Sequence, residues 1–144
     1  MLDLIGTWEL VRTTSTAADG SPMPPPYGGD AAMGVISFRD DGRMVCVLCD
    51  SRARIPGDQP REYNSYCGTF SFDGRQLTTS VDASSNPAWF GTDQVRDVAV
   101  EGDLLVLRPP LRVLVPGRTT RAALAQGVAD GLTRYRSDCT CPIP

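Results

Sequence analysis

The stretch GVISFRDDGRMVCVLC, residues 34–49, decides the fold of this chain. Two apolar runs, 34–38 and 44–49, flank a polar spacer that contains the pair Asp41-Gly42. An Asp-Gly pair between two β-branched runs is a strong signal for a hairpin of two antiparallel strands. Because alternate residues of a strand share a face, the hairpin has one largely apolar face, made by Ile36, Phe38, Met44, Cys46 and Leu48.

Further strand signals lie on both sides of this hairpin and follow one another at short spacing. Asp73-Gly74 and Glu101-Gly102-Asp103 mark two more tight turns, and segments rich in Pro or Ser separate other runs. We expect a loop at 18–33, one helical turn at 61–65 and one short helix at 119–129. The predicted strands are residues 4–14, 34–38, 44–49, 67–72, 76–83, 92–100, 104–107, 111–115 and 131–137.

This pattern predicts an all-β fold, a closed antiparallel up-and-down barrel of about eight strands with at most one or two short helices. Closure removes exposed strand edges and leaves room inside for one small ligand. The 144 residues fit a single domain, 1–144, with a C-terminal tail from about residue 138.

The composition excludes several kinds of chemistry. The chain has no histidine, and all 14 basic residues are arginine, which removes Ser-His-Asp and Cys-His catalysis, lysine Schiff bases and histidine-ligated haem or zinc. A net charge of −3 without a basic stripe argues against nucleic acid as a partner. No apolar run approaches the roughly 20 residues of a membrane span, and no secretory leader begins the sequence, so we expect a cytoplasmic protein.

The five cysteines predict no metal site. Cys46 and Cys49 resemble a C-x-x-C motif, but positions i and i+3 of a strand point to opposite faces and cannot share one ion. Cys139 and Cys141 share a face only if the tail is extended. We expect free thiols in a reducing compartment, no metal and no cofactor.

Four segments carry a resemblance to a known family. They are GTWELV at 6–11, DGRM at 41–44, YCGTF at 66–70 and SNPAWFGTDQVR at 85–96. Over roughly residues 4–108 the chain resembles the bacterial lipocalin-like domain family of small calycin-type barrels. The resemblance implies an up-and-down barrel in which Trp8 closes one end and stacks on a late arginine, Arg134 or Arg136. It implies little about function, although some barrels of this general kind in natural-product pathways are cyclases or isomerases.

The strand at 92–100 carries the most informative polar residues. If Val98 and Val100 face inward, Gln94 and Arg96 do as well, and an inward guanidinium is costly unless it meets an anion. Arg96 either pairs with a structural Asp or stacks on Trp89, or it binds a carboxylate, enolate or carbonyl of a ligand. Ligand contacts are also expected from Trp8, Phe38, Met44, Cys46, Tyr63, Phe70, Asn86 and Trp89.

Three functions fit this sequence, and we favour the first. It is a cofactor-independent cyclase or isomerase of secondary metabolism, which shapes a hydrophobic, polyketide-like substrate while Arg96, Gln94 and Tyr66 polarise it or donate a hydrogen bond. The second is a non-catalytic carrier for a hydrophobic metabolite. The third is a structural barrel with a solidly packed interior. The identity of the ligand and the choice between a monomer and a homodimer stay open.

Overall fold

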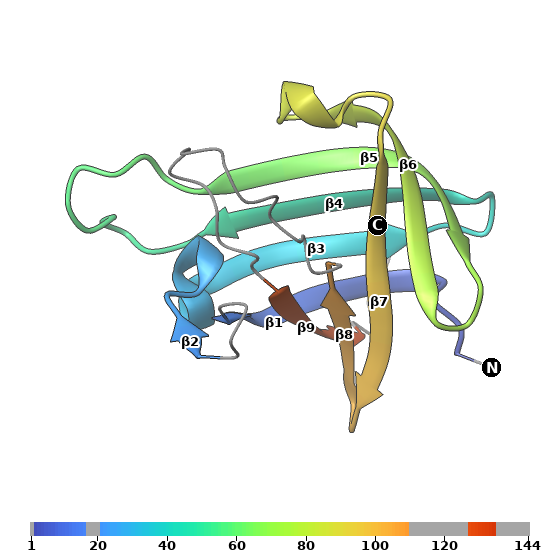
Figure 1. The fold of residues 1–144 in the computed structure, drawn as a ribbon, viewed down its shortest axis with the longest axis horizontal. Helices are drawn as coiled ribbons and strands as arrows, with labels where there is room; N and C mark the ends of the chain where they lie inside the picture. Colours follow the sequence, from blue (N-terminus) through green and yellow to red (C-terminus); the bar gives the residue numbers. More distant parts are fainter. Residues whose placement is uncertain (1, 17–20, 110–126, 135–144) are drawn as a thin grey trace, which may run out of the picture.

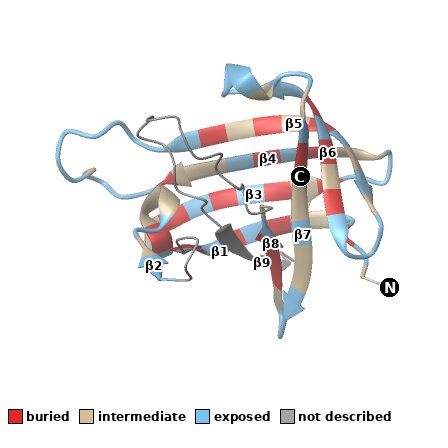
Figure 2. Cartoon of the chain, viewed as in Figure 1, coloured by how far each residue is buried: buried red, intermediate tan, exposed pale blue. Residues whose placement is uncertain are grey.

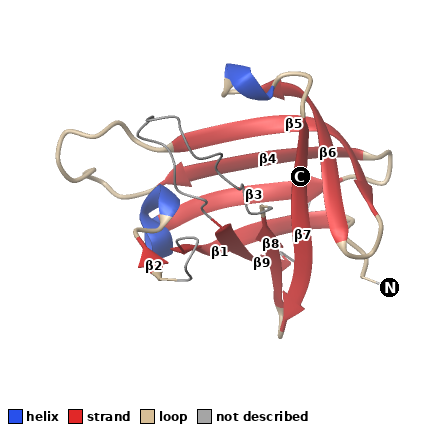
Figure 3. Ribbon diagram, in the orientation of Figure 1, coloured by secondary structure: helices blue, strands red, loops and turns tan. Residues whose placement is uncertain are grey.

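The computed structural model describes residues 2–16, 21–109 and 127–134, and in these the chain is almost entirely β-structure (Figure 3). Two short 3-10 helices are the helical elements of this part. The elements are β1 (Gly6–Thr16), β2 (Pro22–Met23), η1 (Pro26–Ala31), β3 (Ala32–Phe38), β4 (Arg43–Asp50), β5 (Tyr63–Phe72), β6 (Gln76–Ser84), η2 (Pro87–Trp89), β7 (Asp93–Glu101), β8 (Leu104–Arg108) and β9 (Gly127–Arg134).

The strands form one antiparallel sheet in the order β2-β1-β3-β4-β5-β6-β7-β8-β9, with an additional pairing between β1 and β9. Eight of them run up and down in chain order, and β2 adds a two-residue strand beside β1. β1, β3, β4 and β5 lie side by side, and β6 and β7 cross them steeply, so the sheet is a strongly curled half-barrel (Figure 1). The expected all-β, up-and-down architecture is confirmed, and complete closure of the barrel stays a prediction.

Short turns and long connections lie at opposite ends of the sheet, because successive connections of an up-and-down sheet alternate between its ends. The β3–β4, β5–β6 and β7–β8 turns make the hairpin end, and the connections at 17–31, 51–62 and 85–92 make the loop end. The predicted Asp-Gly turns are present. The Asp73 carboxylate accepts hydrogen bonds from the backbone of Arg75 (2.9 Å) and Gln76 (2.7 Å), and Gly74 has a φ of 98° that favours glycine.

The concave face of the sheet carries the core. Buried and exposed residues alternate along β3 and β4 (Figure 2), and Phe38 and Phe70 meet edge to face with ring centroids 5.0 Å apart. At the hairpin end the indole of Trp8 donates a 2.9 Å hydrogen bond to the carbonyl of Leu4. The inward positions predicted from alternation are buried at Trp8, Leu10, Ile36, Phe38, Met44, Cys46, Leu77, Thr79, Val81, Leu105 and Leu107.

Regular alternation along the predicted strand 76–83 would place Ala83 inward with Leu77, Thr79 and Val81, and this expectation is wrong. Cys67 pairs with Ala83 but Gly68 pairs with Val81, so Asp82 is an extra residue in a β-bulge that shifts the alternation of β6. Ala83 is therefore exposed. A Cβ at Gly68 would lie 2.0 Å from the carbonyl oxygen of Ser80, so only glycine fits opposite the bulge.

Other boundaries differ from the prediction. The predicted first strand is shifted by two residues, since β1 spans Gly6–Thr16, and the helical turn expected at 61–65 is wrong because β5 already begins at Tyr63. The predicted loop at 18–33 contains β2 and η1. Of the predicted helix at 119–129, residues 127–129 belong to β9, whose pairing with β1 and β8 overrides local helix propensity. The rest of that helix, the strand at 111–115 and the tail cysteines lie outside the described residues.

Candidate functional site

Two polar residues and one cation face the concave side from β6 and β7. Thr79 is the register partner of Gln94, and Leu77 is the partner of Arg96, so these side chains project from the same face. Thr79 is 1% and Gln94 8% exposed, whereas Arg96 is half-buried. The Gln94 amide donates to the hydroxyl of Thr92 at 3.2 Å. The expectation that Gln94 and Arg96 share the inward face with Val98 agrees with this register, whereas Val100, expected on the same face, is 56% exposed.

Arg96 has no carboxylate partner among residues 2–16 and 21–109, whose side chains the structure describes. Its guanidinium donates a 2.7 Å hydrogen bond to the carbonyl of Val95. The ion pairs of the described residues are Arg39–Asp41, Arg43–Asp82, Arg52–Asp50 and Arg108–Glu101. Arg96 is therefore an inward cation that no acidic side chain of residues 2–16 and 21–109 neutralises.

Tyr66, the third proposed catalytic residue, lies far from this pair. It is buried on β5, where its register partners are Cys46 and Ser84, and its ring meets Trp89 edge to face at 5.3 Å. The partner of Thr79 is Phe70, four residues further along β5, which is roughly 13 Å at 3.3 Å per residue. The fold brings Gln94 and Arg96 together but places Tyr66 nearer the loop end.

The residues expected to contact a ligand fall into three groups. Trp8, Phe38, Met44 and Cys46 are buried in the apolar core, and Phe70 and Trp89 are half-buried against it. Tyr63 is 56% exposed. It alternates with the inward Asn64 and therefore points to the convex face. Asn86, expected to contact a ligand, is exposed and caps η2 by accepting a 3.1 Å hydrogen bond from the backbone of Ala88.

The described cysteines are free thiols, as expected. Cys46 is buried on the concave face and Cys49 lies on the opposite face of β4, which confirms that the C-x-x-C spacing separates them. Among the described residues no three potential ligands gather into a metal site. Cys67 lies on the convex face, with its sulfur 3.5 Å from Oδ1 of Asp82. Partial burial and the neighbouring carboxylate raise the pKa of this thiol.

An open groove of about 400 Å³ lies over β4, β5 and β6 and includes the exposed side chains of Val45 and Phe90. It reaches Tyr66 and Cys67 but neither Gln94 nor Arg96. Because Val45 and Cys67 alternate with inward residues of β4 and β5, this groove belongs to the convex face and is separate from the inward polar group.

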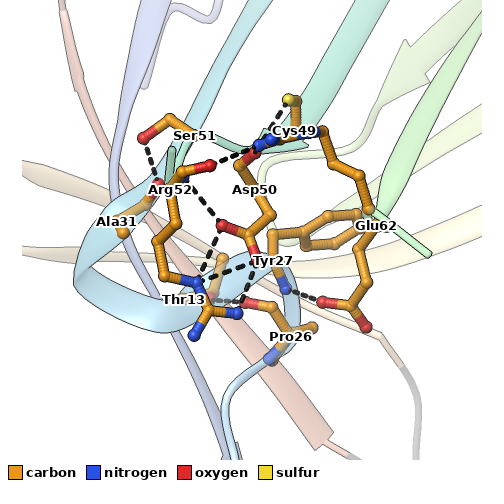
Figure 4. Close-up of polar contacts among 10 residues, drawn as sticks. Thr13, Pro26, Tyr27, Ala31, Cys49, Asp50, Ser51, Arg52 and Glu62 are labelled. Atoms are coloured by element: carbon orange, nitrogen blue, oxygen red, sulfur yellow. Dashed lines mark hydrogen bonds and ion pairs between the residues drawn. The ribbon is translucent and has the colours of Figure 1, made fainter. Parts of the chain in front are cut away.

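Sequence reasoning missed a polar cluster at the loop end, shown in Figure 4. Asp50, only 1% exposed, accepts hydrogen bonds from the backbone of Arg52 (3.0 Å) and from its guanidinium (2.6 Å to Oδ2). These bonds lower the pKa of the Asp50 carboxyl. Arg61 donates to the backbone carbonyls of Asp50 and Arg52. Alternation from Met44 through Leu48 places Asp50 inward, so the signal for this cluster was present in the sequence.

The 3-10 helix η1 lies against this cluster. Glu62 accepts a hydrogen bond from the backbone N–H of Tyr27, and the hydroxyl of Thr13 donates to the carbonyl of Pro26 (Figure 4). A Cβ at Gly28 would lie 2.8 Å from Oδ1 of Asp50, so the backbone of η1 directly contacts the ion pair.

Comparison with known proteins agrees with this fold. A family model described as a lipocalin-like domain matches residues 5–125, which is most of the chain. The chain belongs to the lipocalin-like domain family. No curated protein matches it. The matched range includes the GTW segment and both of the segments at 66–70 and 85–96 that carried the resemblance.

The lipocalin-like fold suggests that the protein binds a small molecule. The inward polar residues are the candidate residues for contacting it. Trp8 and Arg134 are register partners in β1 and β9, so one of the two arginines expected near the indole lies on the adjacent strand. Arg136 is outside the described residues. No described helix of this lipocalin-like domain is both long and apolar enough to cross a membrane.

Proposed function

We propose that this lipocalin-like domain binds a hydrophobic small molecule that carries an acidic or carbonyl group, and that Arg96 holds that group. The observation that carries the proposal is an inward, half-buried guanidinium with no carboxylate partner among the side chains of residues 2–16 and 21–109. An uncompensated cation beside a core is costly for the fold. A ligand anion would remove this cost and form charge-assisted hydrogen bonds.

The surroundings of Arg96 support an amphipathic ligand. Leu77 opposite is 2% exposed, Val98 packs against the core, and Phe70 and Phe72 lie half-buried on β5, the strand beyond Leu77. Gln94, two residues away on the same face, offers an amide near the same point. A ligand with an apolar body and one carboxylate or carbonyl fits this distribution of polar and apolar side chains.

A catalytic form of this proposal is a cofactor-independent cyclase or isomerase acting on a polyketide-like substrate in natural-product biosynthesis. Arg96 and Gln94 polarise a carbonyl while the apolar face holds the substrate in a reactive conformation. Because Tyr66 lies roughly 13 Å along the strand from this pair, it would act on a distant part of the substrate. The geometry supports binding better than this three-residue mechanism, and we take binding as the primary function.

Paired ligands that differ only in charge test the proposal. Dodecanoic acid and its methyl ester share an apolar chain, and binding of each can be measured by native mass spectrometry and thermal shift. We expect the wild type to bind the acid more tightly than the ester, and Arg96→Ala to lose most of this preference. Arg39→Ala is the matched control, because Arg39 is exposed at the hairpin end and pairs with Asp41.

Three further outcomes decide whether Arg96 holds an anion and whether the protein is a catalyst or a carrier. Equal binding of acid and ester by the wild type would contradict a role for Arg96 in holding an anion. Product formation from a polyketide-like enone by purified protein without added cofactor, lost in Arg96→Ala, would support the catalytic form. Binding of such enones without turnover would support a carrier, which we place in the cytoplasm because its described cysteines are free thiols.

A further inference from the structure

The convex face of the sheet is uncharged over the middle of β3, β4 and β5. The alternation that turns Phe38, Met44 and Tyr66 inward turns their neighbours outward. These outward residues, together with Phe90 from the connection after β6, form a surface that we call the valine face. It comprises Met33, Val35, Ser37, Val45, Val47, Cys49, Tyr63, Ser65, Cys67 and Phe90. The solvent face of an antiparallel sheet is normally polar, whereas depletion of charge is typical of the centre of a protein–protein interface.

The large apolar side chains of the valine face are open to solvent. Met33, Val35, Val45, Val47, Tyr63 and Phe90 are each 39–61% exposed. Their exposed area is roughly 600 Å², which is at the upper end of what the largest apolar patch of a monomer covers. A specific interface buries about 1,000–2,000 Å² in total, and two copies of this face offer roughly 1,200 Å². The valine face is therefore large enough for a contact with a second copy of the chain.

The relief of the valine face follows from the strand register. From the loop end to the hairpin end, its three rows are Met33–Cys49–Tyr63, Val35–Val47–Ser65 and Ser37–Val45–Cys67. The first row carries the long side chains. The groove described above lies at the third row, since Val45 and Cys67 line it together with Phe90. The middle row has only short side chains, so a raised row and a hollowed row lie at equal distances on either side of it.

We propose that this lipocalin-like domain forms a homodimer through the valine face, with a two-fold axis along the middle row. The rotation places the first row of one protomer over the third row of its partner. Tyr63 then enters the partner's groove beside Cys67, and Val47 meets its own copy on the axis. The same raised row and hollow are used twice, which is the self-complementarity that a two-fold interface requires. This match favours a second copy over an unrelated partner.

The strands and the border of the face agree with this contact. β3, β4 and β5 run side by side (Figure 1), and sheets that pack face to face with their strands roughly aligned lie about 10 Å apart. Glu9, which pairs with Val35, is exposed at the border, where solvent screens its charge. Arg43 and Asp82 neutralise each other at the hairpin end of the face. The inference goes beyond the proposed binding function, because Arg96 lies on the opposite, concave face.

Analytical ultracentrifugation of the full chain tests the proposal. The chain has a mass of 15.5 kDa, and the dimer sediments with twice this mass. The test variant is Val47→Arg, which places two guanidiniums opposite each other on the axis. Val100→Arg is the matched control, because Val100 is an exposed valine of β7 outside the valine face.

We expect a wild-type dimer with a Kd in the micromolar range. Val47→Arg should raise this Kd about 100-fold or more, since like charges placed opposite each other in an interface are strongly unfavourable. Tyr63→Ala should raise it about tenfold or more, because a tyrosine seated in a groove at the centre of an interface contributes much of the binding. Val100→Arg should stay within about threefold of the wild type.

Alkylation of Cys67 by iodoacetamide, followed by peptide mass spectrometry, locates the contact independently. Cys67 should react more slowly in the wild type than in Val47→Arg at the same protein concentration, and the difference should vanish on dilution below the wild-type Kd. Urea unfolding shows that each variant is folded. If Val47→Arg does not fold, Tyr63→Ala and the concentration dependence of Cys67 alkylation in the wild type carry the test.

Three results would overturn the proposal. The first is a wild type that sediments as a monomer throughout the micromolar range. The second is a dimer that persists in folded Val47→Arg, which would place the contact on another face. The third is equal weakening by Val100→Arg, which would show that added charge anywhere on the surface controls association. Failure of the wild type to bind dodecanoic acid would refute the binding function and leave the dimer proposal standing.

Discussion

Replacing Arg96 by methionine separates a structural role of this residue from a binding role. A structural arginine stabilises the fold, so its loss destabilises the protein. An arginine that serves ligand binding lowers the free energy of unfolding of the ligand-free protein. Its replacement by an apolar side chain of similar length therefore stabilises the fold while abolishing anion binding. The two interpretations therefore predict opposite signs for the change in the free energy of unfolding.

The expected magnitude follows from the surroundings of Arg96. The substitution loses the hydrogen bond to the carbonyl of Val95, which costs about 1 kcal/mol. Full burial of a methionine contributes about 1.5–3 kcal/mol, so half-burial contributes roughly 1 kcal/mol, and the desolvation cost of the guanidinium is relieved as well. The first two contributions cancel, so the net change is the relieved desolvation cost, which we take as a stabilisation of about 0.5–1 kcal/mol for a half-buried group, or a rise in Tm of roughly 1–4 °C for a chain of this size.

Urea unfolding measures this change, with an unaltered m-value as the sign that the unfolded state is unaffected. Arg39→Met, at an exposed position, should stay within about 0.5 kcal/mol of the wild type. A loss of about 1 kcal/mol or more in Arg96→Met, with dodecanoic acid still bound, would refute the reasoning and make Arg96 a structural residue.

Three other predictions concern the fold. Gly68→Ala should lose about 2 kcal/mol or more of unfolding free energy in urea, because the new Cβ meets the backbone of Ser80; stability equal to the wild type would contradict the bulge. Leu77→Ala should lose about 2–5 kcal/mol in the same assay, and a smaller loss would show that the core is loosely packed there. Stability should fall as the pH drops below the ordinary Asp pKa of 3.8. The pKa values of Asp50 and Asp82 are lowered in the folded protein, so the unfolded state binds more protons in this pH range. In Asp50→Asn, urea unfolding at a series of pH values should show a weaker fall.

Much of the concave face could be predicted because local signals fix its register. Two Asp-Gly turns and one apolar face per strand determine which residues of β3, β4 and β5 point inward, and a slip of one residue would expose Phe38 and Met44. The prediction failed at Ala83 because a bulge adds one residue to β6. The only local sign of that bulge is Gly68, on the opposite strand, and a glycine within a strand can equally mark a tight bend or a site where a ligand approaches the backbone.

The candidate site was only partly predictable. Gln94 and Arg96 are two residues apart on one strand, so alternation was enough to place them on one face. The distance to Tyr66 depends on the pairing of β5 with β6, and the predicted strand boundary at residue 67 excluded Tyr66 from β5. The contact of Glu62 with Tyr27 joins residues 35 positions apart through two irregular connections, for which strand periodicity carries no information.

Arg52 and Arg96 show why the charge on the concave side points to a ligand. Both guanidiniums are partly buried, but the first is neutralised by Asp50 at the end of β4. Asp93 and Asp97 lie close to Arg96 in sequence, but Asp97 bonds with Gln76 (3.2 Å) and Asp93 with Ser80 (2.7 Å). Asp82, on the neighbouring strand β6, pairs with Arg43. Strand alternation places Asp93 and Asp97 on the convex face, and Asp82 of the bulge lies there against Cys67. Among residues 2–16 and 21–109, whose side chains the structure describes, no carboxylate pairs with Arg96, and a bound anion would supply one without altering the sheet.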